Sequence, residues 1–276
     1  MNYITVGKEN SCNIDLYYED HGEGKPVVLI HGWPLSSASW ERQVPALLQA
    51  GYRVITYDRR GFGNSSRPAS GYDYDTLTDD LHAIMTRLDL RNATLVGFSM
   101  GGGEVARYLG RYGTERLKGA VFMAAITPFL LKTSDNPAGL DGSVFAEIKQ
   151  AITADRPAFL TSFLSNFYNL HMFGGKKVSD EAVRLSWNIA AAASPKGTLD
   201  CVQAWLTDFR EDLIRIDLPT LVIHGDSDRI LPFAATGNRT HEAVEGSRLM
   251  VIAGAPHGLN WTHAEEVNSE LLAFLG

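Results

Sequence analysis

The sequence predicts an α/β fold, namely a doubly wound, mostly parallel sheet with a helical cap inserted late in the chain. Three observations favour it. Short apolar strand patterns alternate with helical patterns through the first half, which is typical of parallel βαβ units. Strand patterns then vanish between about residues 127 and 215, and they resume afterwards. We therefore expect a core of residues 1–126 and 216–276, interrupted by a helical cap of residues 127–215.

The first half contains strand and helix patterns in alternation. Strands are expected at residues 14–18, 27–30, 52–56, 94–98 and 119–124. One helix is expected to begin near Trp40, because Trp40, Val44 and Leu47 share a face, and Gly51 suits the position after its end. A second helix is expected between Leu77 and Leu88, where apolar residues recur at helical spacing.

The second half begins with aromatic-rich helical segments. Ser194 before Pro195 predicts a helix start, because serine caps a helix and proline suits its first turn. Strands are expected again at residues 220–224 and 249–252. Thr262 and Glu265 stand at capping-box spacing, so the last helix is expected to open there. Its inward side chains are expected to be Val267, Leu271 and Phe274.

Composition restricts the function classes. The chain has 276 residues, 45% of them hydrophobic and 21% charged, and a net charge of -7. Because the chain is acidic and has no runs of basic residues, nucleic acid and anionic membranes are disfavoured as partners. No apolar run is long enough to span a bilayer. The N-terminus shows no secretory signal, and Cys12 and Cys201 lie in unrelated contexts, so we expect a cytoplasmic protein without a disulfide. A homo-oligomer is compatible with the sequence.

The stretch VGFSMGGGEV contains the strongest chemical signal. Gly97, Ser99 and Gly101 fit the pattern G-x-S-x-G, with an expected strand before it and an expected helix after it. Glycines two positions before and after the serine let strand and helix approach closely around a strained turn. The alternative is a dinucleotide turn, but Ser99 would replace its second glycine, and Glu104 stands where a cation would help. We therefore interpret Ser99 as a nucleophile.

A serine nucleophile needs a base, and His257 is the favoured candidate. It lies in a loop after the last expected strand, at the same sheet edge as Ser99. His31 and His224 each end a strand, and one interpretation of them is a metal pair. Local bonding of each ring to the backbone explains them better, because no third ligand is suitably spaced, so we expect no metal site. The other histidines are interpreted as surface or helix-face residues.

The acid that orients the histidine is expected in the loop HGDSDR. Asp226 directly follows the glycine and is expected to bond local amides, whereas Asp228 lies further out, where the loop can bring it beside His257. We favour Asp228, although spacing alone separates the two poorly. The backbone amides of Met100 and Trp33 are the expected oxyanion donors, because Pro34 has no amide hydrogen to donate.

With these residues placed, the chain resembles the α/β-hydrolase family, and within it the cofactor-free haloperoxidase (perhydrolase) and aryl esterase group, close to bacterial bromoperoxidases and γ-lactamases. The matching segments include VVLIHGWPL, YDRRGFGNSS, LVGFSMGGGEVARY, LVIHGDSDRILP and GAPHGLNWTHAEEVNSELLAFL. The resemblance supports Ser99, Asp228 and His257 as a triad and the amides of Trp33 and Met100 as an oxyanion hole. Gly102 departs from it, because similar haloperoxidases often have threonine there.

The resemblance also implies an activity without haem, vanadium, metal or other cofactor. The serine would form an acyl-enzyme from a small ester or a short carboxylic acid, and water or hydrogen peroxide would accept the acyl group. Peroxide would give a peracid that oxidises halide in free solution. The pocket is expected to be lined by Pro34, which similar perhydrolases carry, together with Trp33, Ile126, Trp205 and Ile230.

Two other activities compete with this interpretation. One is a γ-lactamase or amidase acting on small cyclic amides, and the other is a ligand receptor on a hydrolase scaffold without turnover. The segment from Asp58 to Ser65 is conspicuous, but we interpret it as a turn held by side-chain hydrogen bonds.

Overall fold

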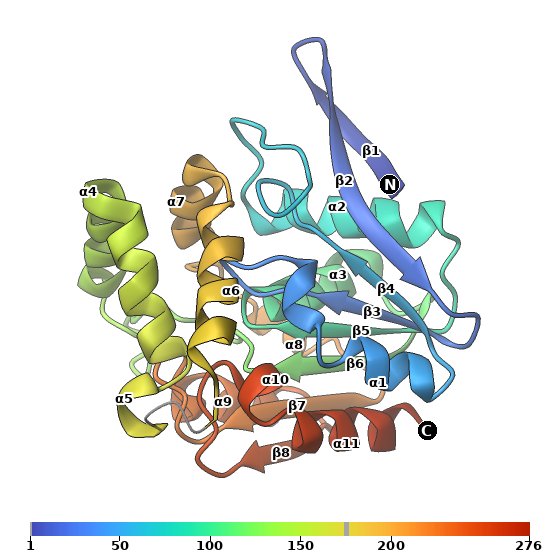
Figure 1. The fold of residues 1–276 in the computed structure, drawn as a ribbon. Helices are drawn as coiled ribbons and strands as arrows, with labels where there is room; N and C mark the ends of the chain where they lie inside the picture. The colour runs from blue at the N-terminus through green and yellow to red at the C-terminus, as the bar shows by residue number, and fades with distance from the viewer. Residues whose placement is uncertain (1, 174–176) are drawn as a thin grey trace.

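A computed structural model describes residues 2–173 and 177–276. One eight-stranded sheet runs through the molecule in the order β1-β2-β4-β3-β5-β6-β7-β8 (Figure 1). Strands β3 to β8 are parallel to one another, whereas β1 and β2 form an antiparallel hairpin that joins the sheet through β4. The strands are β1 (Asn2–Glu9), β2 (Cys12–His21), β3 (Pro26–Ile30), β4 (Arg53–Tyr57), β5 (Ala93–Phe98), β6 (Leu117–Met123), β7 (Thr220–Gly225) and β8 (Arg248–Ile252).

Helices connect these strands and cover both faces of the sheet. They are α1 (Val44–Gln49), α2 (Tyr74–Arg87), α3 (Met100–Tyr112), α4 (Gly142–Phe167), α5 (Leu170–Phe173), α6 (Asp180–Ala191), α7 (Pro195–Ala204), α8 (Arg210–Leu213), α9 (Gly237–Ala243), α10 (Leu259–Thr262) and α11 (Ala264–Leu275), with short 3-10 helices η1 (Ser37–Trp40) and η2 (Phe233–Ala235). The predicted doubly wound, mostly parallel sheet is therefore confirmed.

Two hydrophobic clusters hold the layers together, one on each face of the sheet. Leu81 of α2 and Val105 of α3 belong to the first cluster, whereas Leu47 of α1 and Val267 of α11 belong to the second. Strand β5 lies at the centre and is buried along its whole length. A strand buried on both faces must be almost entirely apolar, which explains why the central strands were recognisable in the sequence.

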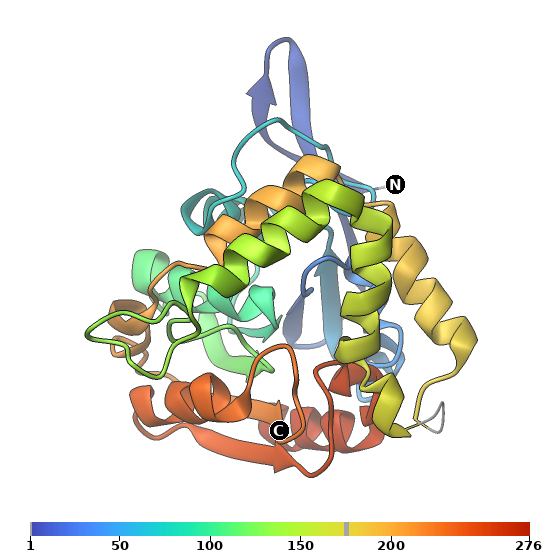
Figure 2. The same cartoon turned by 90° about the vertical axis from the view of Figure 1, so that its left-hand side faces the viewer.

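Helices α4 and α7 cross over one end of the sheet, the end where the parallel strands finish (Figures 1 and 2). Helix α4 is kinked: Asp155 has non-helical angles (φ -158°, ψ 87°) and accepts a hydrogen bond from the amide of Ala158 at 3.0 Å. Its second half therefore has its own cap. The predicted start at Ser194 is confirmed, because its hydroxyl accepts from the amide of Gly197 at 3.2 Å.

Three details differ from the sequence prediction. Strand β1 was not predicted, because its burial pattern leaves one side chain buried and gives a weak apolar signal. Trp40 ends the 3-10 helix η1 and does not belong to the helix that follows, because α1 begins only at Val44. The capping box at Thr262 is wrong: Thr262 ends α10, where its hydroxyl donates to the carbonyl of Gly258 at 3.2 Å, and His263 precedes α11.

Among the helices of residues 2–173 and 177–276, none combines the length and the hydrophobicity that a bilayer crossing requires.

Candidate active site

Ser99 occupies the sharp turn between β5 and α3. Its backbone adopts φ 56° and ψ -118°, a conformation that residues other than glycine rarely adopt. The turn is fixed from both sides, because the Ser99 amide donates to the carbonyl of Met123 at 2.9 Å and its carbonyl accepts from Ile126 at 3.1 Å. A Cβ on Gly97 would come within 2.5 Å of the carbonyl oxygen of Gly101. The flanking glycines therefore have the steric purpose that the motif predicts.

Three side chains from separate loops meet at this turn. His257 Nε2 lies 2.9 Å from Ser99 Oγ, and His257 Nδ1 lies 2.7 Å from Asp228 Oδ2. The aromatic rings of Phe98 and Phe167 flank the imidazole, with centroids 5.2 and 5.1 Å away. His257 and the Asp228 carboxylate are fully buried, so the hydrogen-bonded chain is shielded from bulk water. This is the arrangement required for general-base activation of a serine.

Asp228 is held as an anion by its surroundings. Its Oδ1 accepts from the amides of Ile230 and Leu231, both at 2.8 Å. Although burial opposes ionisation, the electrostatic interaction with His257 and hydrogen bonds from His224 and His257 lower the pKa of Asp228 below its ordinary value. Asp226 is exposed and accepts instead from the amide of Gly254 at 2.7 Å. The structure therefore brings Asp228, not Asp226, to His257.

His224 also contacts the Asp228 carboxylate, which sequence reasoning missed. Its Nε2 lies 2.9 Å from the carbonyl of Leu231 and 3.2 Å from Asp228 Oδ2. A carbonyl can only accept, so Nε2 carries the proton. The predicted local bonding of His224 to backbone is thus confirmed, but the ring also faces the acid of the hydrogen-bonded chain. The sequence feature that could have predicted this contact is the position of His224, four residues before Asp228.

The two expected oxyanion donors lie beside Ser99. Met100 is the first residue of α3, so its amide has no acceptor within the helix. A Cβ on Gly32 would lie 3.0 Å from Ser99 Cβ, which shows how closely the loop before Trp33 approaches the serine. In the part of the chain that the structure describes, neither the Trp33 nor the Met100 amide donates to a protein acceptor. Both are therefore available to a ligand.

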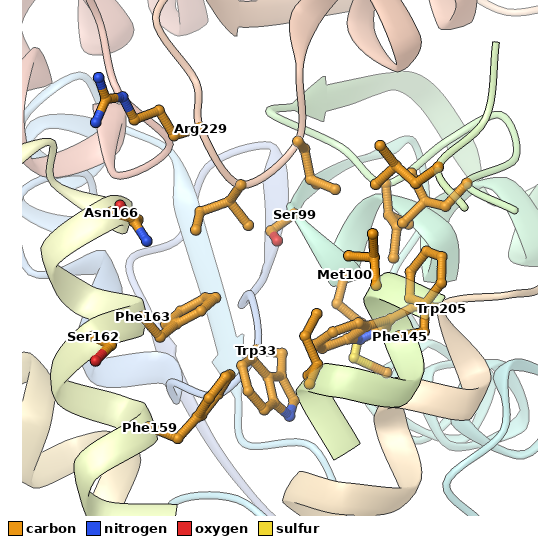
Figure 3. A pocket seen from close by; sticks show the side chains of 17 residues that line it. Trp33, Ser99, Met100, Phe145, Phe159, Ser162, Phe163, Asn166, Trp205 and Arg229 are labelled. Carbon is orange, nitrogen blue, oxygen red and sulfur yellow. The ribbon is translucent and has the colours of Figure 1, made fainter. Parts of the chain in front are cut away.

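An apolar cavity of about 270 Å³ opens onto Ser99 (Figure 3). Trp33, Ile126, Trp205 and Ile230 line it, as the sequence predicts. Pro34 does not line the cavity. It is buried in a turn in which the Leu35 amide donates a hydrogen bond to the Gly32 carbonyl at 3.1 Å, and the neighbouring Trp33 lines the cavity instead. The remaining lining residues are Ser99, Met100, Leu130, Leu140, Val144, Phe145, Ile148, Phe159, Ser162, Phe163, Asn166, Arg229 and Leu231.

Helices α4 and α7 supply the aromatic part of this cavity. Phe159 and Phe163 project from α4 toward Trp33, and Trp205 follows α7. The Trp33 ring meets those of Phe163 and Trp205 edge-on, with centroids 5.1 and 4.8 Å apart. Ser162, Asn166 and Arg229 are exposed, so the polar side chains lie toward solvent. The interior thus suits a small apolar group.

The segment after β4 is held as predicted. Asp58 accepts from the amides of Ser37 and Asn64 at 2.8 and 2.7 Å, and its carbonyl accepts from Ser65 Oγ at 2.5 Å. The residue that follows, Arg59, is buried and paired with Glu104 of α3. Sequence reasoning missed this pair, because the two residues lie far apart in the chain.

Among residues 2–173 and 177–276, no group of three or more His, Cys, Asp or Glu side chains is arranged to hold a metal ion. His263, expected at a surface or helix face, is buried beside Thr262.

Comparison with known proteins agrees with this geometry. The sequence profile of the alpha/beta hydrolase fold family matches residues 25–264. A Synechocystis sp. protein, named as a candidate non-heme chloroperoxidase, is 62% identical over 100% of both chains. A bifunctional esterase/perhydrolase of Acinetobacter calcoaceticus is 37% identical over 100% of this chain and 99% of its own. The crystal structure of a bromoperoxidase from Bacillus anthracis superposes with a TM-score of 0.96 at 55% identity, covering 99% of both chains. This chain therefore belongs to the α/β-hydrolase fold family.

Proposed function

We propose that this chain is a serine hydrolase that acts on small acyl esters through an acyl-enzyme and also transfers the acyl group to hydrogen peroxide. The observation that carries the proposal is the hydrogen-bonded chain from Ser99 through His257 to Asp228, which opens into an apolar cavity. The names of the Acinetobacter and Bacillus relatives, an esterase/perhydrolase and a bromoperoxidase, support the same assignment.

In the first half-reaction, Ser99 Oγ attacks the carbonyl carbon of the ester while His257 Nε2 takes the hydroxyl proton. Asp228 stabilises the imidazolium that forms, because its carboxylate faces Nδ1 at 2.7 Å. The amides of Trp33 and Met100 donate to the oxyanion, and the helix α3 terminus adds a favourable dipole. The tetrahedral intermediate then expels the alcohol, which receives the proton from His257. Ser99 keeps the acyl group.

In the second half-reaction, water or hydrogen peroxide attacks the acyl-enzyme. His257 takes a proton from the attacking oxygen and returns it to Ser99 Oγ as the acyl group leaves. Water gives a carboxylic acid, whereas peroxide gives a peracid that oxidises halide in free solution. A short carboxylic acid can enter by the reverse of hydrolysis. The reaction therefore uses no dedicated halide site.

The cavity and its cover select the acyl group. A volume of about 270 Å³ with aromatic walls favours short, uncharged acyl chains. We propose that residues 127–215 act as a cap on a core of residues 1–126 and 216–276, because Phe163 and Trp205 from this stretch close the cavity over Ser99. We also propose a cytoplasmic location, which fits the free thiols of Cys12 and Cys201.

Two assays on one preparation test the proposal. p-Nitrophenyl acetate hydrolysis and peracid formation from acetate with hydrogen peroxide are measured for the wild type and Ser99→Ala. We expect both activities in the wild type and a loss of at least about 10³-fold in the variant, because the nucleophile is removed. Equal turnover by Ser99→Ala would overturn the nucleophile. Hydrolysis without any peracid would leave an esterase, and turnover confined to a strained bicyclic lactam would make the chain a lactamase.

A further inference from the structure

A buried ion pair lies behind the candidate active site without contacting the hydrogen-bonded chain of Ser99. It joins Arg59, two residues after β4, to Glu104 in α3, and the two side chains are 1% and 0% exposed. Arg59 Nε donates to Glu104 Oε1 at 2.6 Å, and Tyr57 Oη donates to Oε2 at 2.5 Å. Although burial opposes its charge, the carboxylate of Glu104 raises the pKa of Arg59. The guanidinium therefore stays charged inside the protein.

Arg59 also reaches the loop that carries the proposed oxyanion donor Trp33. Its Nη2 donates to the carbonyl of His31 at 2.7 Å, and its backbone amide donates to His31 Nε2 at 3.0 Å. A ring nitrogen that accepts has no proton, so the proton of the neutral imidazole lies on Nδ1. Nδ1 then donates to the carbonyl of Gly32 at 2.9 Å. Arg59 thus fixes both the backbone and the tautomer of His31.

The Gly32 carbonyl shares a peptide plane with the Trp33 amide. In a trans peptide the C=O and N–H bonds point in opposite directions, so fixing the carbonyl also fixes the direction of the amide. Glu104 belongs to the helix that carries the other donor, because it lies four residues after Met100, one turn along the same face of α3. Arg59 and Glu104 therefore connect the two elements whose amides flank Ser99.

Stability alone is a weak explanation for such a pair. Replacing a buried ion pair by uncharged residues of similar volume is often neutral or stabilising, because the desolvation penalty disappears with the charges. Uncharged residues cannot replace the planar guanidinium group of Arg59. Here it donates from Nε to Glu104 and from Nη2 to the carbonyl of His31 in fixed geometry.

We propose that Arg59 and Glu104 are positioning residues that hold the Trp33 and Met100 amides in register with the developing oxyanion. The inference rests on the proposed serine hydrolase function and adds two residues to its machinery. It assigns them an effect on transition-state stabilisation and not on the binding of the ester.

The decisive variant removes both charges together. Arg59→Met/Glu104→Gln leaves no unpaired buried charge and keeps an acceptor for Tyr57. For p-nitrophenyl acetate we expect kcat to fall about tenfold or more, within the effect of losing one oxyanion donor, while KM changes less than twofold. The inhibition constant of phenylboronic acid, whose serine adduct is tetrahedral, should rise by a similar factor. The free energy of unfolding is measured alongside.

A neighbouring ion pair provides the matched control. Arg60 and Asp80 are 7% and 5% exposed and lie 2.7 Å apart, and Asp80 belongs to α2. Arg60→Met/Asp80→Asn removes another buried pair, one that does not bond the His31 loop, so kcat should stay within twofold of the wild type. Arg59→Lys is a second variant that keeps the charge opposite Glu104 but loses the fork, and it should lower kcat without unfolding the protein.

The outcomes separate the inference from the function on which it rests. If the wild type shows no Ser99-dependent hydrolysis, the proposed function is wrong and the positioning role is overturned with it. If the wild type is active and the folded Arg59→Met/Glu104→Gln variant retains its kcat and its affinity for the boronic acid, the function stands and the positioning role is overturned. An equal loss of kcat in the Arg60 and Asp80 control would also overturn it.

Discussion

The Asp228 carboxylate shows how much one side chain depends on its neighbours. It accepts from two backbone amides through Oδ1 and faces His257 and His224 through Oδ2. His224 is fully buried, and its Nδ1 has no hydrogen-bond partner among the described residues. Burying an acceptor without a hydrogen-bond partner lowers the free energy of unfolding by about 1–3 kcal/mol, so this ring destabilises the fold. The contact of Nε2 with Asp228 gives a reason for retaining it.

Replacement of His224 should therefore lower catalysis. His224→Leu removes the donor to Asp228 Oδ2, and a hydrogen bond to a charged group contributes about 1.5–3 kcal/mol, which corresponds to about 10–100-fold in kcat. His224→Gln places an amide donor near the lost Nε2 and should recover part of this loss. Ester hydrolysis is measured for both, with His263→Leu as a buried-histidine control. Equal kcat in His224→Leu and the wild type would remove His224 from the account.

The individual site residues differ in how far the sequence predicts them. Ser99 stands in a specific motif, and His257 is the histidine in the loop after the last strand, so chain order and strand pattern bring them together. Asp226 and Asp228 are two residues apart, and spacing separates them poorly. Their environments in the folded loop differ, because one is exposed and the other fully desolvated. The pairing of Arg59 with Glu104 spans 45 residues and leaves no local signal.

At the scale of elements, β5 and α3 approach so closely at Ser99 that glycines are required around the turn. A Cβ on Gly101 would overlap the carbonyl of Ile30 at the end of β3. A Cβ on Gly102 would overlap the methyl group of Ala125, so a larger residue such as threonine would not fit here without a shift of the chain. The position of α3, and with it the Met100 amide, depends on these two contacts.

A single methyl group at Gly101 tests this dependence. Gly101→Ala should destabilise the protein by about 1–3 kcal/mol through overpacking, although alanine favours a helix, and it should lower kcat by displacing α3. Gly142 at the start of α4 is the matched control, because a Cβ there meets its nearest neighbour at an ordinary 3.6 Å. Urea unfolding and ester hydrolysis are measured for both. A Gly101→Ala variant as stable and active as Gly142→Ala would contradict the account.

The strands at the centre of the sheet are predicted well because they are buried on both faces. Strands β3 to β7 are near-continuous apolar runs, so their positions follow from composition. Strand β1 is largely exposed and antiparallel at the sheet edge, and its alternation is too weak to recognise. The capping box at Thr262 is wrong because the chain forms a separate short helix, α10, that ends at Thr262, and α11 begins after His263.

For the whole molecule, buried histidine makes stability depend on pH. Burial and the charge of Arg59 lower the pKa of His31 well below its ordinary value, so the folded chain keeps this ring neutral. The unfolded chain protonates it below about pH 6.5 and then binds more protons than the folded chain. Stability from this residue is therefore present above that pH and is lost as the pH falls further.

The free energy of unfolding should decrease by about 1.4 kcal/mol per pH unit for this residue below pH 6.5. His31→Asn keeps a donor near Nδ1 but does not titrate, so its curve between pH 7 and pH 5 should be shallower by about one proton. Urea titrations of the wild type and the variant at several pH values check this. Parallel curves for the two proteins would show that His31 does not contribute.

The whole molecule places a strained serine and two free amides at the floor of one apolar cavity, with a buried base hydrogen-bonded to the serine. The central claim is that Ser99 is the nucleophile of this site. The most direct measurement is labelling of the intact protein with a fluorophosphonate, followed by peptide mapping by mass spectrometry. We predict one label per chain, on Ser99, with labelling abolished in Ser99→Ala and slowed in His257→Ala. A label on another residue, or undiminished labelling of Ser99→Ala, would contradict the account.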